Sequence, residues 1–182
     1  MWVWIILGIV VVLFLGGIGI YNSLVQNRVR VREAFSTIDV YLKKRYDLIP
    51  NLVETVKGYA SHEKETFENV TKARNVALAA SDSAGKIEAN KQLSQSLLNL
   101  FAVAENYPDL KANVNFLDLQ TNLSKLEEEI AFSRKYYNGT VREFNTMVQQ
   151  VPSNIVAMLT GFKEEPFFET EEISKNAPEV KF

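Results

Sequence analysis

The chain has 182 residues and no cysteine, so disulfides, thiolate nucleophiles and thiolate metal ligands are excluded. Its formal net charge of −2 gives no basic field of the kind that attracts nucleic acid, and we expect no nucleic-acid partner. The roughly 155 residues after the first apolar segment are enough for one domain with a hydrophobic core.

The first 27 residues carry no charged side chain, and residues 2–21 are apolar or glycine throughout. At about 1.5 Å of rise per residue, a helix of this length covers the ~30 Å hydrocarbon core of a bilayer. A cleaved secretory signal would need a basic start, a shorter apolar core and a small-residue cleavage site, which we do not find. We therefore predict a retained anchor over residues 1–27, with a transmembrane helix that includes Trp2, Val3, Trp4, Ile5, Leu13, Phe14, Ile20 and Tyr21.

Basic residues follow the apolar segment directly, beginning with Arg28, Arg30 and Arg32. Positive flanks stay on the cytoplasmic side of a membrane span. We expect a single-pass protein of the cell (inner or plasma) membrane, with its N-terminus outside and its C-terminal domain in the cytoplasm. The lipid bilayer is then its first partner.

Residues 28–161 show a helical apolar period with few prolines and glycines, and we predict no strand between residues 29 and 151. The fold class expected is all-α, with the transmembrane helix followed by an elongated antiparallel bundle of about four long helices. Pro50 predicts a kink or break near residues 46–49, and Ser61 is a candidate N-cap. The expected bounds are the span to about residue 59, then 61–80, 87–105 and 114–150, with short turns over 153–159.

Residues 162–182 alternate glutamate-rich and aromatic pieces, which predicts an extended, acidic and partly flexible tail. Phe162, Phe167 and Phe168 are too apolar for a free linker. Either they fold back against the bundle, which we favour, or they bind a partner.

Arg45 falls between Leu42 and Ile49 on the apolar face of the first helix, where an aliphatic residue is expected. An unpaired buried guanidinium would cost several kcal/mol. The favoured interpretation is a structural ion pair with Glu105, Asp109 or Glu127. A ligand-binding or partner-binding polar site near Tyr46, Glu105 and Tyr107 is the second, and solvent exposure is the third. The resulting candidate cluster contains Arg45, Tyr46, Glu105, Tyr107 and Asp109.

No catalytic, cofactor-binding or metal-binding residues are predicted. The single histidine, His62, has no second histidine four residues on, as a zinc-binding helix would require. The sequence also has no serine in a strand-to-helix elbow, and its only glycine cluster lies in the predicted span. We expect that the protein is not an enzyme and needs no cofactor.

Several ordered motifs closely resemble the LemA family: RYDLIPNLV at residues 45–53, His62-Glu63, AENYPDLK at residues 104–111, and Arg134 followed by Tyr137-Asn138 and Phe144-Asn145. The resemblance covers nearly the whole chain. It implies a single-pass bacterial membrane protein whose soluble part is a long, coiled-coil-like helical bundle, in a family with no established molecular activity.

The leading functional hypothesis is a non-catalytic, membrane-tethered scaffold or adaptor that presents its helices to protein partners or to its own copies. The alternative is a membrane-surface or envelope-stress component that acts on anionic lipid through the basic helix after the span.

Overall fold

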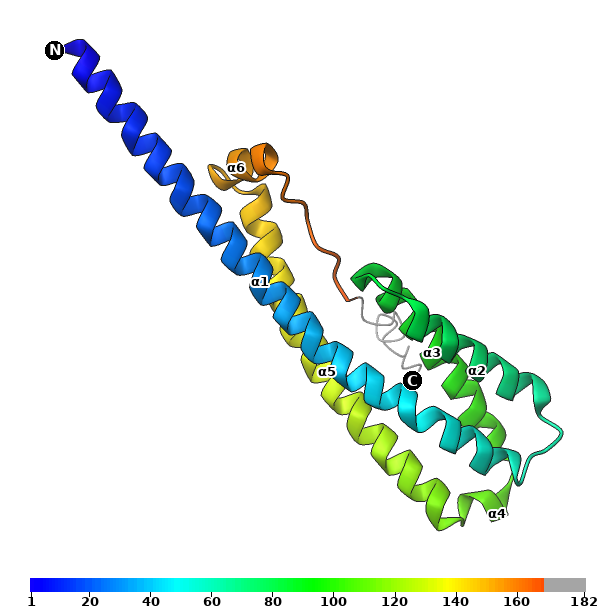
Figure 1. Ribbon diagram of the computed structural model, residues 1–182. Helices are drawn as coiled ribbons and strands as arrows, with labels where there is room; N and C mark the ends of the chain where they lie inside the picture. The colour runs from blue at the N-terminus through cyan, green and yellow to red at the C-terminus, as the bar shows by residue number, and fades with distance from the viewer. Residues whose placement is uncertain (169–182) are drawn as a thin grey trace, which may run out of the picture. The chain divides into compact units, whose positions relative to one another are not determined.

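A computed structural model describes residues 1–168, and over this range it contains six helices and no strand (Figure 1). The all-α class is therefore confirmed. The helices are α1 (Trp2–Lys57), α2 (Lys64–Ala79), α3 (Ser83–Ala104), α4 (Pro108–Lys111), α5 (Val114–Gln149) and α6 (Ser153–Thr160). Residues 169–182 of the predicted tail lie outside the described residues.

The chain forms two compact units, and both α1 and α5 contribute to each of them. Unit 1 contains Met1–Ile38 and Phe132–Phe167, and unit 2 contains Asp39–Ala131 together with Phe168. The boundary between the two units lies inside α1 and α5.

Unit 1 pairs the first part of α1 with the second part of α5. The ring of Phe35 lies 5.5 Å from the ring of Tyr137, and Asn27 Nδ2 lies 3.2 Å from Met147 Sδ. Later residues of α1 therefore meet earlier residues of α5, which makes the pair antiparallel. The buried apolar side chains recur at steps of three, four or seven, as an amphipathic helix requires: Leu24, Val31, Ala34, Ile38, Tyr137, Val141 and Phe144.

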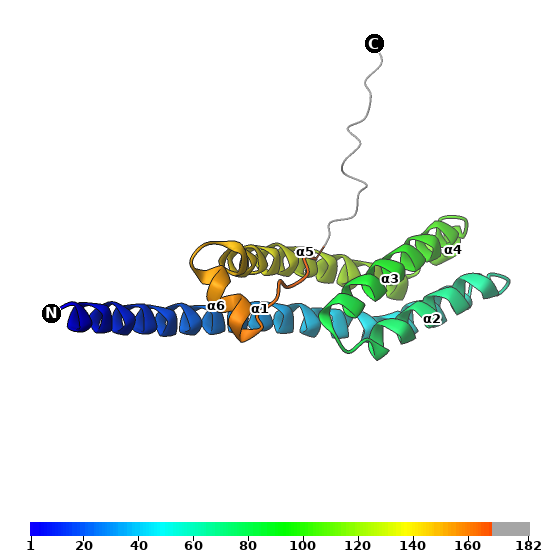
Figure 2. The ribbon, with the colours of Figure 1, turned by 90° about the horizontal axis from the view of Figure 1, so that it is seen from above.

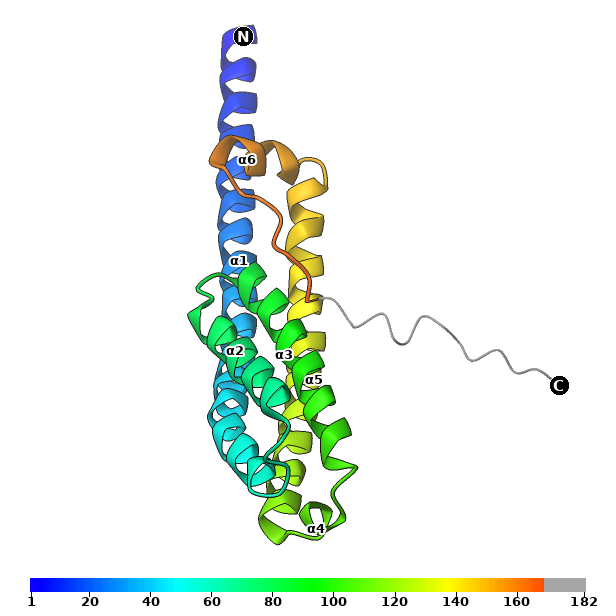
Figure 3. The same cartoon turned by 90° about the vertical axis from the view of Figure 1, so that its right-hand side faces the viewer.

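In unit 2, the end of α1 and the beginning of α5 form a core with the α2–α3 hairpin and α4. Helices α2 and α3 lie side by side (Figures 1 and 3). The core is built from the same periodic pattern: Leu42, Ile49, Leu52, Val56, Phe67, Val70, Leu93, Leu97, Leu100, Phe116, Leu123 and Ile130.

A kink or a break was expected near Pro50, and the structure excludes the break, because α1 continues through this residue. A proline inside a helix leaves the carbonyl four residues earlier without its N–H donor. Here that carbonyl belongs to Tyr46, and Arg74 Nε of α2 donates to it at 2.8 Å. A side chain from another helix thus replaces the missing backbone bond.

Two helix starts differ from the expected positions. Ser61 is not an N-cap, because Glu63 N–H donates to Ala60 C=O at 3.1 Å and encloses Ser61 in a turn. Helix α2 therefore begins only at Lys64. Helix α3 begins earlier than predicted, at Ser83, because the Asp82 carboxylate accepts a bond from Gly85 N–H at 3.3 Å.

The connection between α3 and α5 holds the short helix α4, with Pro108 at its first position. Asn113 then caps α5 by accepting a 3.0 Å bond from Phe116 N–H. Helix α6 ends at Gly161, whose φ of 76° is a left-handed conformation that favours glycine.

Candidate functional site

The first candidate region is the apolar beginning of α1. An 18-residue window of this helix has a mean hydropathy of 2.8, and none of it is buried. Trp2, Trp4, Leu13 and Phe14 are each at least two-thirds exposed, and the chain has one helix of this kind among its described residues. Each large apolar side chain left in water forgoes about 1.5–3 kcal/mol of burial free energy. This surface is suited to an apolar solvent and not to water.

The basic flank follows at the next turns of α1. Arg30 and Arg32 are exposed, whereas Arg28 is half-buried with its guanidinium carbon 5.5 Å from the centre of the Phe162 ring. The geometry is that of a cation–π contact. Two of the three arginines are thus open to a ligand or a surface of negative charge.

The second candidate region is built around Arg45 in unit 2. Its side chain is only 2% exposed. Its Nε atom lies 2.8 Å from Glu127 Oε1 of α5, and its Nη2 atom donates to Ser94 Oγ of α3 at 3.0 Å. Glu127 is one of the three carboxylates that the sequence singled out. The guanidinium therefore joins three helices of the unit.

Tyr46, the neighbour of Arg45, lies in a second set of polar contacts. Its hydroxyl accepts a 2.6 Å bond from Asn90 Nδ2, which also donates to Lys86 C=O at 2.8 Å. Lys86 Nζ in turn contacts Asp39 Oδ1 at 2.5 Å. Together with the bond from Arg74 to the Tyr46 carbonyl, these contacts tie α1 to both α2 and α3.

The other members of the expected cluster lie elsewhere. Glu105 is 67% exposed and pairs with Lys111 at 2.6 Å, and Asp109 is exposed. The Tyr107 hydroxyl is 3.5 Å from Glu63 Oε1, too far for a strong hydrogen bond. The structure thus brings Arg45 and Tyr46 into a buried polar layer and leaves Glu105, Tyr107 and Asp109 outside it.

The residues of this layer that sequence reasoning missed are Ser94, Asn90 and Arg74. Asn90 does carry a signal, since it continues the spacing of Leu93 and Leu97 on the apolar face of α3. A polar side chain at such a position needs a partner in the core. Ser94 and Arg74 carry no comparable signal, because their roles depend on which helix lies opposite.

Chemically, the charged and polar groups of this layer contact one another. The guanidinium meets a carboxylate and a hydroxyl, and the phenol meets an amide, so both sets of groups are engaged within the unit. Among residues 1–168, no group of three or more histidine, cysteine or acidic side chains is arranged to hold a metal ion. His62 is exposed in the turn before α2. Buried polar contacts of this kind can fix the register of packed helices.

Two open grooves mark the surface of unit 2. One, of about 630 Å³, lies between α1 and α2 and has an apolar floor that includes Val53, Phe67 and Val76. The other, of about 610 Å³, lies between α1 and α5 and is lined by both signs of charge, with Lys44 and Glu129 among its residues.

Comparisons with known proteins identify relatives of the chain. The model of the LemA family matches residues 34–182. Protein LemA of Metamycoplasma hominis is 26% identical over 159 residues, which cover 87% of this chain and 73% of that protein. Magnetosome protein MamQ 1 of Paramagnetospirillum magneticum is 25% identical over 175 residues, or 82% of this chain. Magnetosome protein MamQ of Magnetospirillum gryphiswaldense is 24% identical over 174 residues, or 81% of this chain.

The match to the magnetosome proteins covers 64% of their length, so the aligned part of the chain spans less than two-thirds of each. The family match includes Arg45 and Glu127 and begins after the apolar segment.

Proposed function

The chain belongs to the LemA family, and from this premise we propose that it is a non-catalytic scaffold anchored in a membrane by the start of α1. The observation that carries the proposal is the exposed apolar window of α1, which continues without interruption into the helical units. In this proposal the helices display their polar surfaces to protein partners or to further copies of the chain.

Insertion free energy supports the anchor. Thirteen of residues 2–21 are valine, isoleucine, leucine or phenylalanine. On the insertion scale such residues contribute about −0.3 to −0.6 kcal/mol each, or about −4 to −8 kcal/mol together. No charged residue opposes this term before Arg28.

The proposed orientation places the N-terminus outside and the helical units in the cytoplasm, because Arg28, Arg30 and Arg32 all follow the span. The chain lacks cysteine, so single cysteines can report topology without background. A Lys72→Cys label should resist a membrane-impermeant maleimide on intact spheroplasts and react after permeabilisation. Reaction on intact spheroplasts would reverse the orientation.

The scaffold proposal is tested by identifying the proteins that the chain binds. The direct experiment is crosslinking of the full chain in its native membrane, followed by identification of the linked proteins. Defined neighbours or linked copies of the chain support the proposal. A chain that stays monomeric and unlinked at saturating crosslinker contradicts it.

The non-catalytic part of the proposal is supported by the engagement of the buried polar groups with one another. The Arg45 guanidinium contacts the Glu127 carboxylate and the Ser94 hydroxyl, so these groups already bind one another. The full chain in detergent should give no turnover on panels of peptides and esters, with or without divalent metal ions. Turnover of any of these substrates would refute the non-catalytic part of the proposal.

A second candidate function is action on anionic lipid through the basic flank, and the exposure of Arg30 and Arg32 favours it. The test is the amount of phosphatidylglycerol that stays with the chain after detergent extraction. Replacing Arg28, Arg30 and Arg32 by glutamine should lower this amount. A matched control replaces three exposed lysines of unit 2, Lys64, Lys72 and Lys91, and should leave it unchanged. Equal retention in both variants would remove this candidate.

A further inference from the structure

Helix α6 exposes an apolar face that the proposed function does not use. Ile155, Met158 and Leu159 are 52%, 76% and 78% exposed, and Val151 just before the helix is 70% exposed. Residues 155, 158 and 159 share one side of the helix because they are spaced by three and four. The opposite side is held in unit 1 through the buried Ala157.

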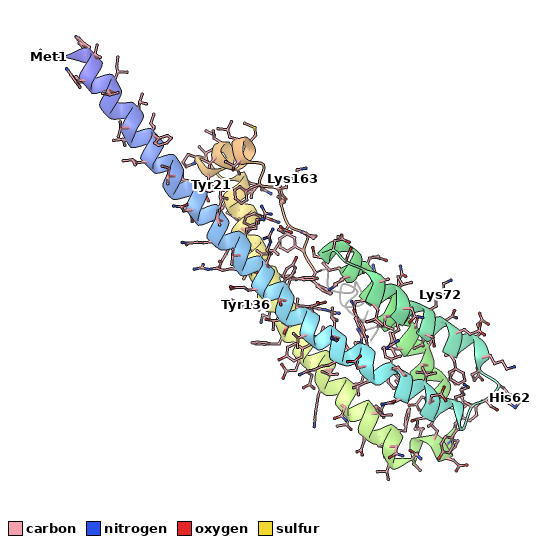
Figure 4. All side chains as sticks on the ribbon, in the orientation of Figure 1. Met1, Tyr21, His62, Lys72, Tyr136 and Lys163 are labelled. Carbon is pink, nitrogen blue, oxygen red and sulfur yellow. The ribbon has the colours of Figure 1, made fainter. Side chains whose placement is uncertain are left out.

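The position of this face in unit 1 is fixed by Phe162, which follows α6. The Phe162 ring lies 5.9 Å from the ring of Tyr21 on α1 and 6.2 Å from the ring of Phe144 on α5. Figure 4 labels Tyr21 beside α6, with Lys163 just after it. Tyr21 is the last residue of the apolar segment of α1. Helix α6 therefore lies where the proposed span ends.

The distribution of charged residues also changes at the end of the proposed span. Residues 1–27 carry no charge, and neither do residues 144–162. Helix α1 and the end of α5 run antiparallel here, and Asn27 contacts Met147 near one end of each stretch. The first charges beyond them are Arg28 after the first stretch, and Glu143 and Lys163 on the two sides of the second. Two separate parts of the sequence thus become uncharged at one height in unit 1, as a surface that enters lipid requires.

A short segment keeps α6 in this place. After Gly161 the chain turns back along α5, as Figures 2 and 3 show. Asn145 holds the Glu165 backbone by two bonds of 2.9 Å, one from the amide of Asn145 and one to its carbonyl oxygen. The Tyr137 hydroxyl donates to Pro166 C=O at 2.8 Å. Helix α6 is therefore a fixed part of unit 1 and presents its apolar face in one direction.

We propose that α6 is a second membrane contact, lying in the headgroup layer beside α1 with Ile155, Met158 and Leu159 in the acyl boundary. The inference rests on the proposed membrane anchor. Interfacial helices typically place their apolar face about 5–10 Å into this boundary. Phospholipid is the occupant that the structure favours, because the anchor necessarily brings lipid to this height. The uncharged polar residues around the face, such as Asn154 and Gln150, suit the headgroup layer.

The test uses the full chain in phosphatidylcholine vesicles with an environment-sensitive fluorophore on a single cysteine. The test variant is Met158→Cys, and the matched control is Tyr136→Cys, which is 61% exposed on α5 of the same unit. A third variant, Leu13→Cys, reports the span. The quenchers are iodide in the water and doxyl groups carried by the lipid, either near the headgroup or deep in the acyl chain.

The Met158→Cys label should be quenched more strongly by the shallow doxyl lipid than by the deep one, and little by iodide. The Tyr136→Cys label should show the reverse. Quenching of Met158→Cys by iodide alone would overturn the inference. Protection from both quenchers would also overturn it, since a protein surface would then cover the face. The Leu13→Cys label separates the two claims: if deep doxyl lipid fails to quench it, the anchor itself is refuted.

Discussion

The ion pair between Arg45 and Glu127 gives the sharpest prediction about stability. Glu127→Ala removes the carboxylate 2.8 Å from a guanidinium that is 2% exposed. Removing one partner of a fully buried pair costs about 3–5 kcal/mol, because the other charge stays buried without compensation. Glu127 is 40% exposed, so water can partly replace it, and we expect about 2–3 kcal/mol.

Replacing Arg45 should lower the free energy of unfolding less than replacing Glu127. Arg45→Met leaves a carboxylate that water already reaches, and we expect a cost of about 1 kcal/mol or less. The double variant Arg45→Met, Glu127→Leu should lie within about 1 kcal/mol of the parent chain, because a buried pair and an apolar replacement of similar volume are often close in free energy. The coupling between the sites then has the opposite sign to the single costs.

The assay is thermal unfolding of the full chain in detergent, monitored by circular dichroism. For a chain of this size, about 2–3 kcal/mol corresponds to a fall of about 4–12 °C in melting temperature. Glu128→Ala is the matched control, since Glu128 is an exposed neighbour with the same helix propensity. It should change stability by less than about 0.5 kcal/mol. If Glu127→Ala behaves like Glu128→Ala, the buried pair does not hold the helices as argued.

Two further predictions concern backbone groups held by side chains. Arg74→Ala leaves the Tyr46 carbonyl without its donor and should cost about 1–3 kcal/mol of unfolding free energy. The cost should shrink in a Pro50→Ala background, where an N–H returns to that carbonyl, and equal costs in both backgrounds would contradict the assignment. Asn145→Ala removes both bonds to Glu165, so hydrogen exchange of the Glu165 amide should accelerate about tenfold or more, and unchanged exchange would exclude this role.

The long helices could be predicted because their apolar residues recur at steps of three and four. Four of the six helices, α1, α2, α3 and α5, correspond to helices that the sequence predicted. The burial of Arg45 could also be predicted from the sequence, since this residue interrupts the apolar face between Leu42 and Ile49. Its pairing with Glu127, from among three candidate carboxylates, depends on which turn of α5 lies opposite. Periodicity within one helix does not contain that information.

The other differences between the predicted and observed helices also depend on side-chain contacts that the apolar pattern does not indicate. A kink or break was expected near residues 46–49, because Pro50 removes a local backbone bond. The helix continues there, and Arg74 of another helix donates to the Tyr46 carbonyl in place of the missing N–H. Asp82 extends α3 because its carboxylate reaches Gly85. The exposed face of α6 was invisible in a segment short enough to be taken for one or two turns. The position of this face beside the end of the apolar segment depends on the contact between the Phe162 and Tyr21 rings, which the sequence does not indicate.

The central claim is that residues 2–21 stay in the bilayer as the anchor of the helical units. The most direct measurement is the intact mass of the chain recovered from membranes after alkaline carbonate washing. The account predicts that the full 20.7 kDa chain remains in the membrane pellet. A chain released by carbonate, or one whose mass shows that the apolar segment has been removed, would contradict it.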